Sequence, residues 1–416
     1  MTRPAVGPPA PWRFPEVRAD RLANGLAVRA CHVPGQELAS ARLVLPGGAA
    51  AEPEGAYGAA YAAAAALLLG GVASAAEDLG AVVNAEVSWD ALAVTVTAPA
   101  RVLGDALARA AAAVAAAQLD AATVARVCHD RLAALAREPA QARAEAALCA
   151  AAFAGTRYAD PPGGTEQQVA ALGHATVSAY LRSVATPQGA TLVVAADPAA
   201  VDAAALADRV LGGWRGGPAP EAPAAVTPTS PEAAVVVPVP GAAQSHVAIG
   251  CVTPPRRDPA YPALTLAADC LAGTFSARLN TRLRERDGVA YAAFGAVEGW
   301  RATGRWTASF ACARDVTRDA VRAALAEVAD VADGGLTADE IAAARGHRVG
   351  SLPLQVHTTP ALAAAVAENA ALGLPDDAQA RLRAACADCP DDDVRAAAAT
   401  WLRPAAMVVA VAGGLS

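Results

Sequence analysis

Arg284 and Tyr291 are the side chains to which the sequence most clearly gives a chemical task. Six residues separate them, and Gly288 lies between an expected helix that carries Arg284 and an expected strand that contains Tyr291. A guanidinium and a phenol can both donate hydrogen bonds to an oxygen that gains negative charge. Two simpler interpretations stay open from the residues alone: aromatic packing for Tyr291, and for Arg284 a solvated helix charge among Arg278, Arg282 and Arg286.

The other reactive side chains do not form a recognisable site. The six His residues include no pair at i, i+3 or i, i+4 spacing, so no helix face carries two imidazole ligands. Cys128, His129 and Asp130 are adjacent, but neighbours on a helix point to different faces and cannot act as a catalytic set. We interpret the single Cys-x-x-Cys, Cys386 with Cys389, as structural because no second pair accompanies it. The sequence also contains no P-loop, dinucleotide fingerprint or Ser nucleophile elbow.

Length and composition restrict the class of protein. A chain of 416 residues is too long for one typical core, and we expect two domains. Apolar residues make up 55% of the chain and aromatic residues only 4%, so the cores must consist mainly of Ala, Val and Leu. A net charge of −7 without a basic run argues against nucleic acid and against an anionic membrane as partner. Peptide is the partner that remains.

The termini and the cysteines suggest a location. The first fifteen residues contain no apolar segment typical of a secretory signal. The longest uncharged apolar run, residues 59–69, is shorter than the about twenty residues that span a bilayer. Eight scattered Cys residues do not form a disulfide framework. We therefore expect a soluble, cytoplasmic protein with reduced thiols and no membrane partner.

The two halves of the sequence repeat one order of features. Residues 42–71 run from a strand through an acidic Pro turn and a Tyr to an apolar helix that ends in Gly, and residues 247–273 repeat this order. A segment rich in Pro, Gly and Ala separates the halves. We predict an N-terminal domain over 1–215, a linker over 216–235 and a C-terminal domain over 236–416.

Periodicity indicates the same elements in each half. The predicted strands are residues 26–31, 41–45, 92–97, 191–195, 246–251, 289–297 and 305–311. The predicted helices are residues 101–118 and 121–137, with others that begin at 316, 338 and 360. This pattern predicts an α+β fold of two homologous α/β sandwich domains. Each would be a mixed, largely antiparallel sheet with helices over one face.

Residues 47–71 resemble the zinc-helix region of the pitrilysin/insulinase-type metallopeptidases, the inverzincins, which include the mitochondrial processing peptidases. In that family a Glu-Pro turn leads into a helix with His-x-x-Glu-His, where two imidazoles hold zinc and the Glu activates a water. Here Tyr61 and Ala65 stand at the imidazole positions and Ala64 at the Glu position. Alanine has no lone pair for a metal and no group to accept a proton. The resemblance therefore implies a degenerate zinc site without metal.

The resemblance extends over most of the chain. If Pro139 aligns with the family's Pro after the helix of the third zinc ligand, that ligand falls on or near Arg131. Tyr61 is interpreted as a space-filling residue, because a phenol with a pKa of about 10 is a poor base at neutral pH. Residues 22–26 and 79–90 resemble the family's opening strand and the edge strand after the zinc helix.

Residues 276–291 resemble the Leu-Arg…Gly-Leu-Ala-Tyr signature of the family, with the same six residues between Arg284 and Tyr291. In the family this Arg and Tyr reach across a chamber to the zinc site of another domain and hold the substrate near its scissile carbonyl. The resemblance implies the same role for Arg284 and Tyr291 at the site of a partner. Residues 272–274 lack the long Gly-rich loop of the mitochondrial regulatory subunit, so presequence recognition is not expected.

Two functions follow from the resemblance. In the first, the chain is the non-catalytic subunit of a heterodimeric zinc metallopeptidase and is inactive alone. It would hold no cofactor, while a homologous subunit with His-x-x-Glu-His would carry zinc, and a peptide or precursor peptide would be the substrate. In the second, the chain is a peptidase-derived scaffold or interaction protein with no role in proteolysis.

Overall fold

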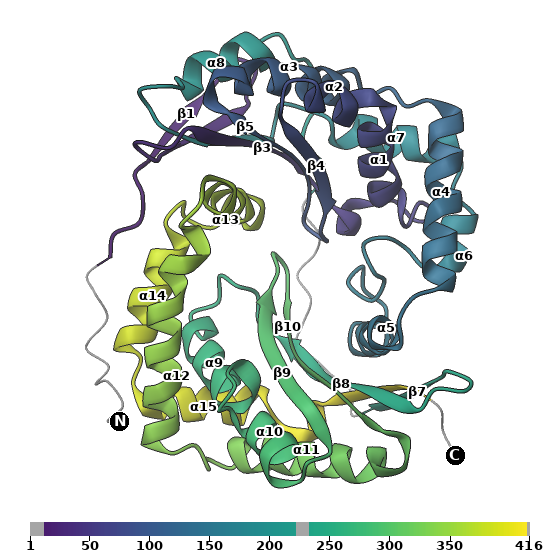
Figure 1. Ribbon diagram of the computed structural model, residues 1–416, viewed down its shortest axis with the longest axis vertical. Coiled ribbons are helices and arrows are strands. Elements are labelled where there is room, and N and C mark those ends of the chain that lie inside the picture. Colours follow the sequence, from purple (N-terminus) through teal and green to yellow (C-terminus); the bar gives the residue numbers. More distant parts are fainter. Residues whose placement is uncertain (1–11, 222–232, 414–416) are drawn as a thin grey trace.

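Two mixed β-sheets with helices on their outer faces form the two halves of the chain (Figure 1). The computed structural model describes residues 12–221 and 233–413. Part of the predicted linker over 216–235, residues 222–232, lies outside the described residues, as do residues 1–11 of the N-terminal segment. The first strand of the second sheet begins at Ala233, within the range predicted as linker.

The first half contains a six-stranded sheet in the order β1-β2-β6-β3-β5-β4. Its strands are β1 (Val17–Arg21), β2 (Ala27–His32), β3 (Leu38–Pro46), β4 (Val82–Val87), β5 (Ala91–Pro99) and β6 (Thr191–Ala196). Its longer helices are α1 (Ala59–Leu67), α3 (Ala100–Ala116), α4 (Ala121–Ala136), α5 (Ala140–Ala152), α7 (His174–Val184) and α8 (Ala203–Leu211). Shorter turns of helix are η1 (Ala49–Ala51), η2 (Leu68–Val72), α2 (Ala73–Glu77) and α6 (Glu166–Ala170).

The second half contains a five-stranded sheet in the order β7-β11-β8-β10-β9. Its strands are β7 (Ala233–Pro238), β8 (Gln244–Thr253), β9 (Ala290–Gly299), β10 (Gly304–Ala313) and β11 (Val408–Gly413). Its longer helices are α9 (Tyr261–Ala268), α11 (Thr317–Ala332), α12 (Ala338–Ser351), α13 (Thr359–Leu372), α14 (Ala378–Asp388) and α15 (Asp391–Trp401). Shorter pieces are η3 (Asp269–Gly273), α10 (Arg278–Asn280), η4 (Thr281–Arg286), η5 (Arg314–Val316), η6 (Leu352–Val356) and η7 (Pro404–Ala406).

The two sheets repeat one topology. The order β2-β6-β3-β5-β4 in the first sheet corresponds to β7-β11-β8-β10-β9 in the second. In both, the first two of these strands are parallel and the remaining neighbours are antiparallel. The predicted α+β fold of two mixed, largely antiparallel sheets with helices is therefore confirmed.

The two halves exchange one helix each, which the sequence did not predict. Helix α13 of the second half packs on β3 and β6 of the first sheet, and α5 of the first half packs on β8 and β11 of the second (Figure 1). Leu362 and Val366 are fully buried against the first sheet. Leu148 is fully buried against the second, and its Cδ1 lies 3.2 Å from where a Cβ on Gly250 would be. Each sheet thus has its inner apolar face covered by the opposite half.

A cluster of aromatic side chains joins the halves beside these helices. The ring of Trp300 from the second half lies 4.3 Å from that of Trp89 and stacks on Tyr158 at 5.2 Å. Asp90 is buried there, where its carboxylate accepts hydrogen bonds from the Tyr158 hydroxyl at 3.2 Å and from the Arg301 backbone N–H at 3.0 Å. The exchange and this cluster hold the two halves as one unit.

Helix α1, the counterpart of the zinc helix, lies in the core of the first half. Its Ala residues are nearly all buried, and small side chains let neighbouring helices approach closely. The helix begins after Gly58, whose φ of 92° lies in the left-handed region. The run Ala59–Glu77 is long and apolar enough to cross a membrane by length and composition, although Gly70 and Gly71 break its helical geometry. This run is longer than residues 59–69, the apolar run that was judged too short to span a membrane from the sequence.

A buried carboxylate caps the N-terminus of α1. Glu52 accepts hydrogen bonds from the backbone N–H groups of Gly58 at 3.0 Å and Ala60 at 2.7 Å, and Arg157 lies 3.3 Å from the same carboxylate. The Arg157 guanidinium stacks on Tyr57 at 3.5 Å. Burial raises the pKa of Glu52 to about 7, despite these donors, because the charged form loses its hydration.

The helix exchange predicts where a core defect acts. Leu148 belongs to the first half in sequence, but it packs on the second sheet. Leu148→Ala should remove these contacts and lower the free energy of unfolding by about 2–5 kcal/mol. Amide hydrogen exchange should therefore accelerate more in β8 and β11 than in β2 and β6. Leu103→Ala, on the outer side of the first half, is the matched control and should show the opposite pattern. Faster exchange of the first sheet in Leu148→Ala would contradict the observed packing.

The Glu52 carboxyl predicts a pH dependence of stability. Because its folded-state pKa of about 7 exceeds the ordinary 4.5, the folded chain binds this proton more tightly than the unfolded chain. The stabilisation is complete below pH of about 4.5 and is lost as the pH rises through about 7, by at most about 3 kcal/mol. Glu52→Gln should remove this part of the pH profile of the unfolding free energy, and the exposed Glu54→Gln should not. Parallel profiles for wild type and Glu52→Gln would refute the assignment.

Candidate functional site

Two residues of the predicted degenerate zinc motif, Tyr61 and Arg131, lie together in the structure. The Arg131 guanidinium carbon on α4 lies 5.1 Å from the ring centroid of Tyr61 on α1, and Arg131 Nε donates to the Gly163 carbonyl at 3.2 Å. A Cβ at residue 163 would lie 2.7 Å from the Arg131 guanidinium, so glycine leaves room for this side chain. Ala64 is buried and Ala65 is half-buried against the core.

This set of side chains does not fit zinc. A phenol, a guanidinium and two methyl groups provide neither imidazole nor carboxylate, which are the ligands of catalytic zinc. The guanidinium also carries a fixed positive charge where a cation would have to sit. Over residues 12–221 and 233–413, no group of three or more His, Cys, Asp or Glu residues could hold a metal ion. We therefore derive no metal chemistry from this position.

Arg284 and Tyr291 lie together on the second half. Arg284 is on η4, and Tyr291 is the second residue of the edge strand β9. The pairing of β9 with β10 shifts between Phe310 and Cys312, which forms a bulge at residues 291 and 292. The Tyr291 side chain is 87% exposed. The bulge therefore displays a phenol on the surface, beside the helix end that carries the guanidinium.

Arg284 differs from Arg278 and Arg282 in its partners. Arg278 forms ion pairs with Glu340 and Asp330, and Arg282 pairs with Asp287 at 2.8 Å. Arg284 instead contacts two rings: its guanidinium carbon lies 4.3 Å from the Phe275 centroid and 5.4 Å from the Tyr291 centroid. Among the described residues it has no ion pair or hydrogen bond, and the Tyr291 hydroxyl also has no hydrogen-bond partner. Both groups keep their donors available to a molecule from outside.

The chain does not bring its own two sets of predicted residues together. Helix α1, which carries Tyr61, lies in the upper half of Figure 1. Strand β9, which carries Tyr291, and α10, which directly precedes the η4 segment of Arg284, lie in the lower half. No contact between the two sets is present in the described part of the chain. Arg284 therefore faces another molecule, or solvent, rather than the degenerate site of the same chain.

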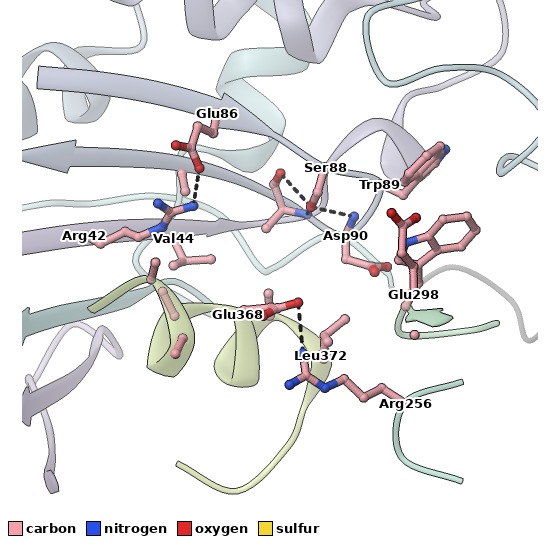
Figure 2. Close-up of a pocket in the computed structure, with 18 of the residues that line it drawn as sticks. Arg42, Val44, Glu86, Ser88, Trp89, Asp90, Arg256, Glu298, Glu368 and Leu372 are labelled. Atoms are coloured by element: carbon pink, nitrogen blue, oxygen red, sulfur yellow. Dashed lines mark hydrogen bonds and ion pairs between the residues drawn. The ribbon is translucent and has the colours of Figure 1, made fainter. Parts of the chain in front are cut away.

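A cavity of about 820 Å³ between the halves was not predicted from the sequence (Figure 2). Its walls come from β3, the β4–β5 hairpin, the end of β9 and α13, which lie far apart in the sequence. Figure 2 shows the two ion pairs that line it, Arg42 with Glu86 at 2.7 Å and Arg256 with Glu368 at 3.0 Å. In each ion pair of this cavity the Arg is mostly buried beneath a half-exposed Glu. None of Tyr61, Arg131, Arg284 and Tyr291 contributes to its lining.

Two of the cysteines are not placed to act as nucleophiles. Cys128 is buried while His129 and Asp130 are exposed, as expected from their helix positions. Burial raises the pKa of the Cys386 thiol to about 12, which is the opposite of what a reactive thiolate requires.

Comparison with known families and proteins agrees with this geometry. The family model described as Insulinase (Peptidase family M16) matches residues 28–166, and the one described as Peptidase M16 inactive domain matches residues 172–346. A protein named uncharacterized zinc protease from Streptomyces coelicolor is 30% identical over 168 residues, which are 40% of this chain and 37% of that protein. A zinc protease of the same description from Mycobacterium tuberculosis is 32% identical over 113 residues, 27% of this chain and 26% of that protein. The aligned part thus spans 37% of the first relative's length and 26% of the second's.

Solved structures match over nearly the whole chain. The peptidase M16 inactive domain from Pseudomonas fluorescens superposes with a TM-score of 0.88 at 19% identity, covering 96% of this chain and 98% of that one. A protease from Helicobacter pylori gives 0.87 at 15% identity, covering 96% and 99%. A chain of Complex III2 from Candida albicans gives 0.81 at 18% identity, covering 96% of both chains. By its two family matches and its fold, the chain belongs to the insulinase family of peptidases, family M16, as an inactive-domain-like member without a zinc site among its described residues.

Proposed function

We propose that this chain is the non-catalytic subunit of a heterodimeric zinc metallopeptidase, and that it supplies Arg284 and Tyr291 to the zinc site of a homologous partner. One observation carries the proposal. Arg131 lies over the ring of Tyr61 on the helix of the degenerate motif, while the half-buried Arg284 contacts only the rings of Phe275 and Tyr291 and has no carboxylate partner among the described residues. Arg278 and Arg282, on the same segment, do pair with nearby acids.

The chemistry of the two donors suits the hydrolysis of a peptide bond. Zinc and a Glu in the partner would supply the activated water, which is the task of the His-x-x-Glu-His motif. Arg284 would donate hydrogen bonds to the carbonyl oxygen of the substrate as that oxygen gains negative charge. The Tyr291 hydroxyl would donate a further one, and its exposure leaves it free to do so.

The partner and the substrate follow from the same proposal. The partner is a homologous subunit of this family that keeps His-x-x-Glu-His, and the substrate is a peptide or precursor peptide held in a chamber between the subunits. The expected setting is the cytoplasm. The alternative is that this chain is a scaffold without a role in proteolysis, since a chain of Complex III2 from Candida albicans has the same fold.

Kinetics of the reconstituted heterodimer separate these two functions. Arg284→Ala should leave folding and assembly nearly intact and lower turnover about a hundredfold or more, because one oxyanion donor typically contributes about 3–4 kcal/mol. Arg284→Lys should restore little of this loss, since an ammonium cannot reproduce the planar fork of a guanidinium. Tyr291→Phe should cost less in the same direction.

The matched control is Arg286→Ala, which removes an exposed Arg from the same short helix. Its turnover number should equal that of the wild-type complex. Equal turnover for Arg284→Ala and wild type in an assembled, active complex would assign this chain to the scaffold function instead.

A further inference from the structure

We propose that Phe275 is a positioning residue for Arg284. This role rests on the proposed function of Arg284. Phe275 lies in the segment between η3 and α10, nine positions before Arg284, and outside the residues of the Arg and Tyr signature. Its ring is the closer of the two that contact the guanidinium, at 4.3 Å against 5.4 Å for Tyr291. Arg284 is therefore held between one ring from a loop and one from a strand.

The exposure of Phe275 is unusual for a Phe side chain. Its side chain is 55% exposed, so burial of its own surface contributes little to its position. A ring beside a guanidinium gains from the attraction of the positive charge to the π-face, and it limits the rotamers of a long side chain. This contact orders Arg284 without using any of its N–H donors, which an ion pair would occupy. A guanidinium held this way remains able to bind an incoming oxygen.

A buried amide joins the two backbone segments that carry these rings. Asn280 is fully buried, and its Nδ2 donates to the Phe275 carbonyl at 2.6 Å. Its Oδ1 accepts from the backbone N–H of Ala293 at 3.1 Å, two residues beyond Tyr291 on β9. One side chain thus ties the loop that carries Phe275 to the strand that carries Tyr291. Since a buried amide with both ends bonded is costly to displace, the backbone that carries Phe275 is held in place beside the strand that carries Tyr291.

The first readout uses the isolated chain and needs no partner. Ring currents of Phe275 and Tyr291 should shift the side-chain proton resonances of Arg284 in the NMR spectrum of arginine-labelled protein, assigned by their loss in Arg284→Lys. Phe275→Leu should move these resonances toward the values of a solvated arginine, and Phe275→Tyr should retain them. Because Phe275 is half-exposed, both variants should fold, which circular dichroism verifies. Unchanged Arg284 resonances in folded Phe275→Leu would overturn the proposal.

The second readout is the kinetics of the complex with a zinc-bearing subunit. Phe275→Leu should lower kcat about three- to tenfold with little change in KM, and Phe275→Tyr should restore it. If Arg284→Ala lowers turnover but Phe275→Leu does not, positioning by Phe275 is wrong while the proposed function stands. If Arg284→Ala has no effect, the proposed function fails first, and the NMR comparison still shows separately whether Phe275 orders Arg284.

Discussion

The exchange of helices α5 and α13 between the two halves is the constraint on which the rest of the structure depends. Each sheet has two apolar faces, and an uncovered face would expose rows of Val, Leu and Ala to water. The helices of each half cover only its outer face, so the inner face is covered by the other half. Neither half can therefore keep its packing without its counterpart. The stacked rings of Trp89, Trp300 and Tyr158 reinforce this dependence at the place where the halves meet.

This frame explains how a peptidase fold persists without its metal. Helix α1 is kept in place by burial of its Ala residues and by the Glu52 cap, and neither requires zinc. Arg131 packs over Tyr61 on this helix, and this contact also involves no metal. The second half meanwhile carries Arg284 on η4 and Tyr291 on the edge strand β9.

Much of the fold and part of the candidate site could be predicted from the sequence. Alternation in β5 and the helical period of α3 and α4 depend on local patterns, so their predicted ranges match the observed ones within a few residues. A family register based on Pro139 placed the third ligand position on or near Arg131, and Arg131 lies beside Tyr61 in the structure. The helix exchange could not be predicted, because the apolar stripe of a helix does not specify which sheet it will cover. No helix was predicted over residues 140–152. The contact of Phe275 with Arg284 was also missed, since no spacing rule connects a loop aromatic to a helix nine residues later.

The central claim is that the surface around Tyr291 meets the zinc site of a different subunit. A photo-crosslinking amino acid at position 291 tests this directly, because Tyr291 is exposed and its replacement should not disturb the core. The chain would be co-expressed with a homologous subunit that carries His-x-x-Glu-His, irradiated, and the cross-linked peptides identified by mass spectrometry. The account predicts cross-links to the partner's helix that bears this motif. Assembly of the two chains without such cross-links, or cross-links to another copy of this chain alone, would contradict it.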